Sequence, residues 1–364
     1  MIMKNYLAIS ACLLTSMWML SACDKSDNTD TPPFIKETLP DGLAVLNEGN
    51  YAYKINGSLD YLDYQDDNML RNVFSSVNGR SLGGTPNSAV LSSNGEIFTA
   101  TTDENRIEIM DAFTMKSTGH IDIRCPRKLT IMEGFVYVSS YTGKVYKIKD
   151  DTHSLVDSSE VVGANLEGIA VAKGHVYVCN STNADYSYNS NVVMLDTELN
   201  KLKDINVVTN PTQLVSDGSR VYLVSQGNYY DIKAEVQQID TKTDAVANIG
   251  TATMIALGPN GLYMINAPWG AVPIYSYLDF GTGMTRKFIE GTEIFNPYSI
   301  GVDPLTSDVY ISSLSEDPET HYSSYSMDGY LTRYKADGTF VKQYPCGVNP
   351  GTILFISHVA IFQE

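Results

Sequence analysis

The stretch PGTILFI (residues 350–356) is a short apolar strand that opens a unit which residues 357–364 are too few to complete. A turn, often with proline, followed by a similar strand occurs six times earlier in the chain. These copies begin at Pro86, Pro126, Leu166, Pro211, Thr253 and Pro297. Their spacing runs from 40 residues (Pro86 to Pro126) to 53 residues (Pro297 to Pro350). Repeats of about 40–45 residues are typical of four-stranded propeller blades.

Each repeat has the same internal pattern of strands and turns. The first strand leads into a tight polar turn, as in SSNGE (residues 92–96), and then into a β-branched and aromatic strand, as in FVYVSS (residues 135–140). Third and fourth strands follow, with the period-two alternation that is typical of half-buried strands. No long amphipathic helix pattern occurs between them. The sequence therefore predicts an all-β chain of four-stranded antiparallel sheets.

The opening repeat lacks its first strand. Its second strand is expected at Leu43–Asn47, its third at Ser58–Asp63 and its fourth at Asn72–Ser76. An open ring would expose two unpaired sheet edges, which invite aggregation. We therefore expect residues 350–356 to pair beside Leu43–Asn47. The prediction is a seven-bladed β-propeller over residues 42–364, closed by pairing of the C-terminal strand with the N-terminal blade.

Residues 1–22 have the pattern of a lipoprotein signal peptide. Lys4 precedes the apolar run YLAISACLLTSMWML (residues 6–20), which is too short to span a bilayer with normal flanks. The quartet Leu20-Ser21-Ala22-Cys23 resembles a bacterial lipobox and predicts lipidation at Cys23. An ordinary secretory signal is the alternative.

Residues 23–41 are polar and acidic, and we expect them to form a flexible tether. Acidic residues directly after the lipidated cysteine resemble the surface-export signal of Bacteroidota lipoproteins. We therefore expect the protein to be anchored by lipid in the outer membrane and to face the cell exterior. The periplasmic leaflet is the alternative.

Charge and cysteine content bear on the classes of function. The chain has 25 Lys and Arg against 42 Asp and Glu, which gives a formal net charge of −17. So acidic a composition disfavours nucleic acid as a partner, because phosphates need Lys and Arg. Cys125, Cys179 and Cys346 are scattered, and no CxxC motif occurs. We therefore expect no disulfide framework, no metal site and no cofactor.

The loops that join second to third strands are long and rich in Tyr, Asn and Ser, whereas the turns expected at the other face are short. Tyr and Trp supply rigid contact area, and Asn and Ser supply hydrogen bonds, so one face is expected to bind a ligand. A packing role for any single tyrosine is the alternative. The candidate ligand-binding residues are Asn47, Glu48, Asn50, Tyr51, Asn180, Tyr186, Tyr188, Gln226, Tyr229, Tyr230, Trp269, Tyr322 and Tyr325.

Four segments resemble a known family. They are LNEGNY (residues 46–51), NGSLDYLD (56–63), ENRIEIMDAFTMKSTGHI (104–121) and PRKLTI (126–131). They look like the YncE-like surface-layer propellers of Bacteroidota, which are lipoproteins of the BtuG type. The resemblance implies a seven-bladed propeller, a surface lipid anchor and capture of cobalamin for a TonB-dependent transporter. No short motif marks a corrinoid contact, so no binding residue is transferred, and long loop insertions leave the ligand open.

Catalytic motifs are sparse in this sequence. Neither HExxH nor GxSxG occurs, and we expect a binding protein rather than an enzyme. Glu48, Asn180 and Asn266 lie at the ends of second strands. They form the alternative, a metal-dependent lactonase-like or lyase-like site. A third hypothesis is an adhesion or scaffold propeller that binds protein or glycan.

Overall fold

The computed structural model describes residues 38–290 and 294–358. The predicted signal peptide, lipidation site and nearly all of the tether lie outside the described residues. Within the described part, no helix is both long and apolar enough to cross a membrane.

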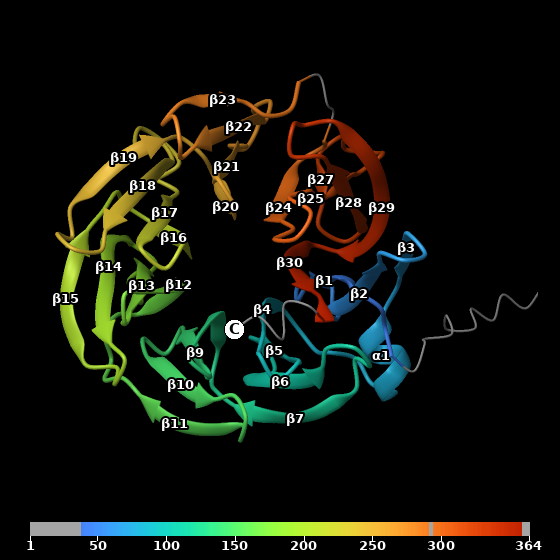
Figure 1. Cartoon of the computed structure of the whole chain (residues 1–364), viewed down its shortest axis with the longest axis horizontal. Coiled ribbons are helices and arrows are strands. Elements are labelled where there is room, and N and C mark those ends of the chain that lie inside the picture. Colours follow the sequence, from blue (N-terminus) through green and yellow to red (C-terminus); the bar gives the residue numbers. More distant parts are fainter. Residues whose placement is uncertain (1–37, 291–293, 359–364) are drawn as a thin grey trace, which may run out of the picture. The chain divides into compact units, whose positions relative to one another are not determined.

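The described chain forms seven four-stranded antiparallel sheets around a central axis (Figure 1). Blade 1 contains β30 (Pro350–Ile356), β1 (Gly42–Asn47), β2 (Ser58–Asp63) and β3 (Asn68–Leu70). Blade 2 contains β4 (Pro86–Leu91), β5 (Glu96–Thr101), β6 (Arg106–Asp111) and β7 (Ser117–Asp122). Blade 3 contains β8 (Pro126–Met132), β9 (Phe135–Ser140), β10 (Val145–Lys149) and β11 (Ser154–Ser158). Blade 4 contains β12 (Asn165–Ala172), β13 (His175–Thr182), β14 (Tyr188–Asp196) and β15 (Lys201–Asn206).

The last three blades repeat this order. Blade 5 contains β16 (Pro211–Ser216), β17 (Arg220–Ser225), β18 (Glu235–Asp240) and β19 (Val246–Gly250). Blade 6 contains β20 (Met254–Gly258), β21 (Gly261–Asn266), β22 (Ile274–Asp279) and β23 (Thr285–Lys287). Blade 7 contains β24 (Pro297–Val302), β25 (Val309–Ser313), β28 (Asp328–Tyr334) and β29 (Phe340–Val348). A small hairpin of β26 (Ser315–Glu316) and β27 (Ser323–Ser324) interrupts blade 7 between β25 and β28.

The ring closes as the sequence predicts. β30 pairs antiparallel with β1, so that Leu43 lies opposite Phe355 and Val45 opposite Ile353. Figure 1 shows the red β30 beside the blue β1, although the two strands come from opposite ends of the chain. β30 also contacts both neighbouring inner strands, β24 and β4. The seven-bladed propeller and its closure are therefore confirmed.

The prediction for the fourth strand of blade 1 is wrong. The outer strand is β3 (Asn68–Leu70), and the segment expected as a strand, Asn72–Ser76, instead enters helix α1 (Val73–Asn78). Asn72 has a left-handed backbone with φ of 54°, which ends the extended run. The first turn of α1 then buries Val73 and Phe74 completely. Burial of a large apolar side chain stabilises a fold by about 1.5–3 kcal/mol, which outweighs a weak local preference for a strand.

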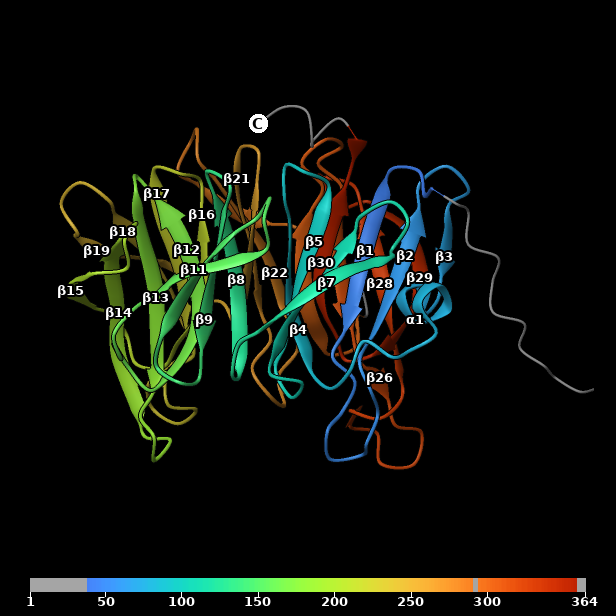
Figure 2. The same cartoon turned by 90° about the horizontal axis from the view of Figure 1, so that it is seen from below.

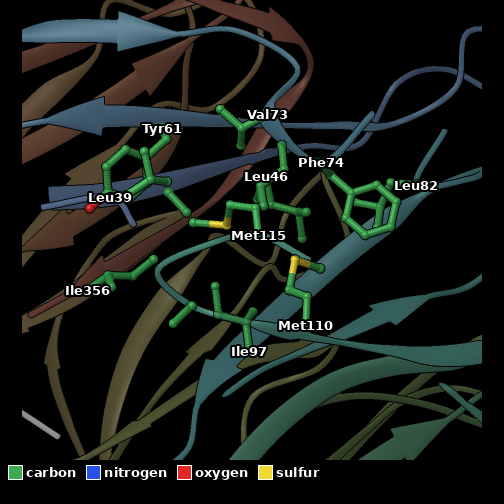
Figure 3. Close-up of a cluster of buried hydrophobic side chains, with 13 residues drawn as sticks. Leu39, Leu46, Tyr61, Val73, Phe74, Leu82, Ile97, Met110, Met115 and Ile356 are labelled. Carbon is green, nitrogen blue, oxygen red and sulfur yellow. The ribbon is translucent and has the colours of Figure 1, made fainter. Parts of the chain in front are cut away.

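Adjacent blades pack face to face through apolar side chains. Figure 3 shows one such cluster, in which Leu46 and Phe74 of blade 1 and its helix meet Ile97 and Met110 of blade 2. Leu39 joins this cluster with only 1% of its surface exposed, and its N–H donates to the carbonyl of Phe113. The packed core therefore includes Leu39, which lies within the expected tether of residues 23–41.

A buried carboxylate joins the first and last blades. Asp60, on β2, is fully buried. It accepts hydrogen bonds of 2.9 Å from the Asn47 side chain and from the backbone N–H groups of Asn72 and Gly347. The guanidinium Nε of Arg71 lies 3.0 Å away from the same carboxylate. Because Gly347 belongs to β29, Asp60 ties blade 7 to blade 1 beside the closing strand.

A second, exposed link crosses the same joint and gives a prediction for acid conditions. Asp67 accepts from Lys342 Nζ at 2.7 Å and from the Tyr344 hydroxyl at 2.5 Å. The Lys342 hydrogen bond, followed by that of Tyr344, lowers the pKa of Asp67. Its stabilising contribution is therefore present above the unfolded-state pKa and is lost as pH falls through the folded-state pKa.

We expect Asp67→Asn to lower the free energy of unfolding at neutral pH by less than about 1 kcal/mol, because the pair is solvent-exposed. Urea unfolding at a series of pH values measures this difference. The difference in the free energy of unfolding between variant and native protein should become smaller as the solution is acidified towards about pH 3. A difference that stays constant over this range would show that the charge of Asp67 does not matter.

Candidate functional site

The two faces of the ring differ in the length of their loops. Loops between second and third strands and the connections between blades emerge on one face, which we call the loop-rich face. Figure 2 shows the loop after β1 and the loop that carries β26 projecting from its lower edge. The opposite face carries the turns between first and second strands, such as residues 133–134 and 173–174. The asymmetry expected from the sequence is therefore present in the structure.

Three of the candidate tyrosines gather around one recess on the loop-rich face. This tyrosine recess spans blades 3 to 5 and has a volume of about 370 Å³. Its lining residues are Tyr141, Asn165, Glu167, Ser181, Thr182, Tyr186, Tyr188, Asn210, Thr212 and Tyr229. The recess thus combines four aromatic rings with amide, hydroxyl and carboxylate groups, the mixture found in small-molecule sites.

The aromatic rim is held in place by its own loops. The rings of Tyr188 and Tyr229 meet edge to face, with centroids 6.1 Å apart. Tyr186 and Tyr229 both have φ of 63°, a conformation that is uncommon for a bulky residue. Both rings nevertheless remain largely exposed, at 76% for Tyr186 and 67% for Tyr229. Strained backbone that presents exposed aromatic rings is typical of binding sites.

Hydrogen bonds within these loops support the strained residues. The Asp185 carboxylate accepts from the N–H of Ser187 at 3.0 Å and from its hydroxyl at 2.6 Å. The Asn228 side-chain oxygen accepts from the N–H groups of Tyr230 and Ile232, each at 3.0 Å. The rim is therefore preorganised, so that ligand binding orders few further groups.

Glu167, one of the lining residues, forms an ion pair with Arg127, which does not itself line the recess. Arg127 Nη2 lies 2.9 Å from Glu167 Oε1, and the guanidinium carbon lies 4.4 Å from the centre of the Tyr141 ring. The Tyr141 hydroxyl donates to the same carboxylate. Burial, reinforced by Glu167, raises the pKa of Tyr141, so this phenol stays protonated at neutral pH. The negative charge of Glu167 in the lining is therefore offset by the guanidinium of Arg127.

Arg127, Tyr141 and Glu167 were not among the sequence candidates. A signal for two of them is present in the repeats. Arg127 and Glu167 occupy the same repeat position, directly after Pro126 and Leu166, where Tyr298 stands in blade 7. An alignment of the repeats at this position would have identified the charged pair.

Several predicted residues near the axis have structural hydrogen bonds. Asn47 is buried and donates to Ser58 and Asp60. Asn180 accepts from the N–H of Ala164 at 3.3 Å and donates to Asn191 at 3.1 Å. Gln226 donates to the carbonyl of Thr253 at 2.9 Å, and Glu48 accepts from the Tyr298 hydroxyl at 2.7 Å. None of these four side chains lines the tyrosine recess.

A second group of predicted residues lies across blades 1 and 7. The Asn50 side chain donates to the carbonyl of Tyr325 at 2.9 Å, which joins the loop after β1 to the loop after β27. Tyr51 is exposed on the loop after β1, and Tyr322 is exposed between β26 and β27. Two further predicted residues, Tyr230 and Trp269, are 84% and 88% exposed and lie outside the recess. The candidate residues are therefore spread over the loop-rich face rather than gathered around one recess.

Over residues 38–290 and 294–358, no group of three or more His, Cys, Asp or Glu side chains is placed to hold a metal ion. His321 lies in an acidic loop and pairs with Glu316, with Nδ1 and Oε1 2.7 Å apart.

Solved structures share this fold at low sequence identity. A quinoprotein alcohol dehydrogenase-like protein of Bacteroides thetaiotaomicron aligns with a TM-score of 0.60 at 15% identity, over 86% of this chain and 78% of that chain. A protein of Bacteroides uniformis described as a candidate 6-phosphogluconolactonase aligns with a TM-score of 0.61 at 14% identity, over 87% of this chain and 100% of that chain. Hydrazine synthase of Kuenenia stuttgartiensis aligns with a TM-score of 0.58 at 16% identity, over 74% of this chain and 89% of that chain. At these identities the similarity shows the fold alone.

Sequence comparison assigns the chain to a family. No curated protein matches it significantly. A family model described as a domain of unknown function, DUF5074, matches residues 41–355, which is nearly the whole propeller from before β1 to the end of β30. The chain therefore belongs to the DUF5074 family.

Proposed function

We propose that this propeller is a binding protein whose tyrosine recess takes a small-molecule ligand. The observation that carries the proposal is the recess itself, which has a volume of about 370 Å³ and is lined by four tyrosines and by polar groups, among them Glu167 in its ion pair with Arg127. Pockets of about 300–1,000 Å³ with a few fixed polar groups are typical ligand sites. The preorganised rim supports binding, because little conformational entropy remains to be lost.

The chemistry of the recess favours a ligand with a flat or ring-shaped apolar part. Tyr186, Tyr188 and Tyr229 offer ring faces and edges, while Asn165 and Asn210 offer amide groups. A corrinoid such as cobalamin is the specific ligand that we propose, on the strength of the sequence resemblance. A ligand of that size would extend beyond the recess, and Tyr230, the exposed neighbour of Tyr229 in the sequence, is a candidate for further contact.

We further propose that the chain is anchored in the outer membrane through lipid on Cys23 and passes its ligand to a TonB-dependent receptor. The sequence pattern at Leu20–Cys23 supports the anchor. Mass spectrometry of the mature N-terminal peptide tests acylation, and protease treatment of intact cells tests exposure at the surface. An unmodified N-terminus would contradict the lipid anchor. A protein that resists protease until the cells are lysed would contradict exposure at the surface.

Calorimetric titration with cobalamin tests the ligand. We expect Tyr229→Ala to weaken binding by about 2 kcal/mol, roughly thirtyfold, because this ring forms part of the recess wall. Tyr53→Ala is the matched control, since Tyr53 is an exposed tyrosine on the same face but outside the recess. Cobalamin affinity that is micromolar or weaker would reject the corrinoid. Equal losses in the two variants would place the site elsewhere on the face.

A further inference from the structure

A second cavity lies on the axis of the ring. It has a volume of about 360 Å³ and is lined by the opening residues of the first strands of all seven blades. Because first strands begin at the loop-rich face, this axial cavity lies at that end of the channel. Its polar lining includes Ser88, Lys128, Thr212, Tyr298, Ser299 and Thr352.

Lys128 is the only cationic residue in this lining. Its Nζ donates to the backbone carbonyl of Asn87 at 2.6 Å. No carboxylate in the described part of the chain pairs with it. Arg127, the adjacent cation, differs because Glu167 satisfies its guanidinium from the side of the tyrosine recess. Lys128 is half-buried, and an ammonium group with three donors and one protein acceptor leaves two N–H donors for water or a ligand in the cavity.

The electrostatic surroundings of Lys128 agree with this description. Burial lowers the pKa of Lys128, and Glu48 opposes the shift without reaching ion-pair distance. Arg127 lowers the pKa further, while Glu167 opposes that effect. A negatively charged group in the cavity would reverse the effect of burial by stabilising the charged ammonium.

We propose that the axial cavity binds the carboxylate group of a small organic acid through Lys128. A single negative charge fits, because one unpaired cation faces the cavity. A dianion such as phosphate would bring a second charge that no cation of the lining offsets, and Glu48, which accepts from the lining residue Tyr298 at 2.7 Å, would repel it more strongly than a monoanion. Ser88 lies beside Lys128 and supplies a hydroxyl whose oxygen accepts from the N–H of Leu129 at 3.0 Å. Its own hydrogen is therefore available to a carboxylate oxygen.

This site goes beyond the ligand proposed for the tyrosine recess. The two cavities have only Thr212 in common among their lining residues, and Lys128 belongs to the axial cavity alone. Loss of cobalamin binding in Tyr229→Ala would leave the carboxylate site intact. The two proposals can therefore fail independently.

Calorimetry with benzoate and benzamide, probes of the same shape that differ in charge, tests the proposal on the native protein. We expect benzoate to bind about tenfold or more tightly than benzamide, as a charge-assisted hydrogen bond requires. Inorganic phosphate should bind more weakly than benzoate. Equal binding of benzoate and benzamide, tighter binding of phosphate, or no heat with benzoate would overturn the proposal.

Lys128→Met removes the charge and keeps the length of the side chain. We expect it to weaken benzoate binding about tenfold or more and to leave benzamide binding unchanged. Lys173→Met is the matched control, because Lys173 lies exposed in the turn between β12 and β13 on the opposite face. Benzoate affinity that is unchanged in Lys128→Met, or reduced equally in Lys173→Met, would also overturn the proposal. Should Lys128→Met fail to fold, the benzoate and benzamide comparison decides alone.

Discussion

Removal of residues 349–364 is expected to abolish the folded propeller. This truncation deletes β30, which pairs with β1 along its whole length and contacts the inner strands on both sides. Blade 1 would keep three strands, and β1 would present an unpaired edge to the axis. Because native domains are stable by only about 5–15 kcal/mol, loss of the innermost strand of a blade is expected to leave the folded state unstable.

Urea unfolding followed by circular dichroism measures this effect. The truncated protein should aggregate or unfold without a cooperative transition in conditions where the native protein is folded. Removal of residues 359–364 alone is the control, because it leaves β30 complete. A truncated protein that unfolds cooperatively at the urea concentration of the native protein would contradict the role of β30 in closing the ring.

Asp60→Ala is expected to give the largest loss of stability among single substitutions at the joint between blades 1 and 7. The change removes one acceptor from Arg71 and leaves the Asn47 side chain and two backbone N–H groups without their carboxylate. Breaking a buried charge pair in this way typically costs about 3–5 kcal/mol. The free energy of unfolding in urea should fall by about that amount.

Two further variants distinguish the effect of losing the buried charge from a nonspecific loss of stability. Asp122→Ala removes a carboxylate that is 88% exposed at the end of β7, and it should change stability by less than about 0.5 kcal/mol. In the double variant Asp60→Ala, Arg71→Met, part of the loss should return, because no buried charge is left without its partner, and Asp328, the other partner of Arg71, is exposed to solvent. Equal effects of Asp60→Ala and Asp122→Ala would show that the buried carboxylate does not hold the joint.

The ring and its closure could be predicted because their determinants are local and repeated. The turn-and-strand element at Pro86 and Pro126 recurs around the chain, and its last copy at Pro350 supplies the strand that the first blade lacks. The fourth strand of blade 1 could not be placed in this way. Short apolar runs such as residues 73–77 do not distinguish a strand from one and a half turns of helix, and here burial of Phe74 decides.

The site was predicted in part, for a related reason. Tyr186, Tyr188 and Tyr229 lie in long polar loops, so composition alone indicated them, and the structure brings their rings together. Arg127 and Glu167 lie 40 residues apart in neighbouring blades. Their pairing depends on the side-by-side packing of two inner strands, which no local pattern expresses. Lys128 was missed for the same reason, since its position becomes distinctive only when seven strands surround an axis.

The origin of β30 also has a consequence for the order of events during biosynthesis. β30, the innermost strand of blade 1, is translated some 300 residues after its partner β1, so the ring stays open while the rest of the chain emerges from the ribosome. Pairings between such distant segments form late, because a long loop must first be closed. The first blade is therefore completed only when the last strand of the propeller has been synthesised and pairs with β1.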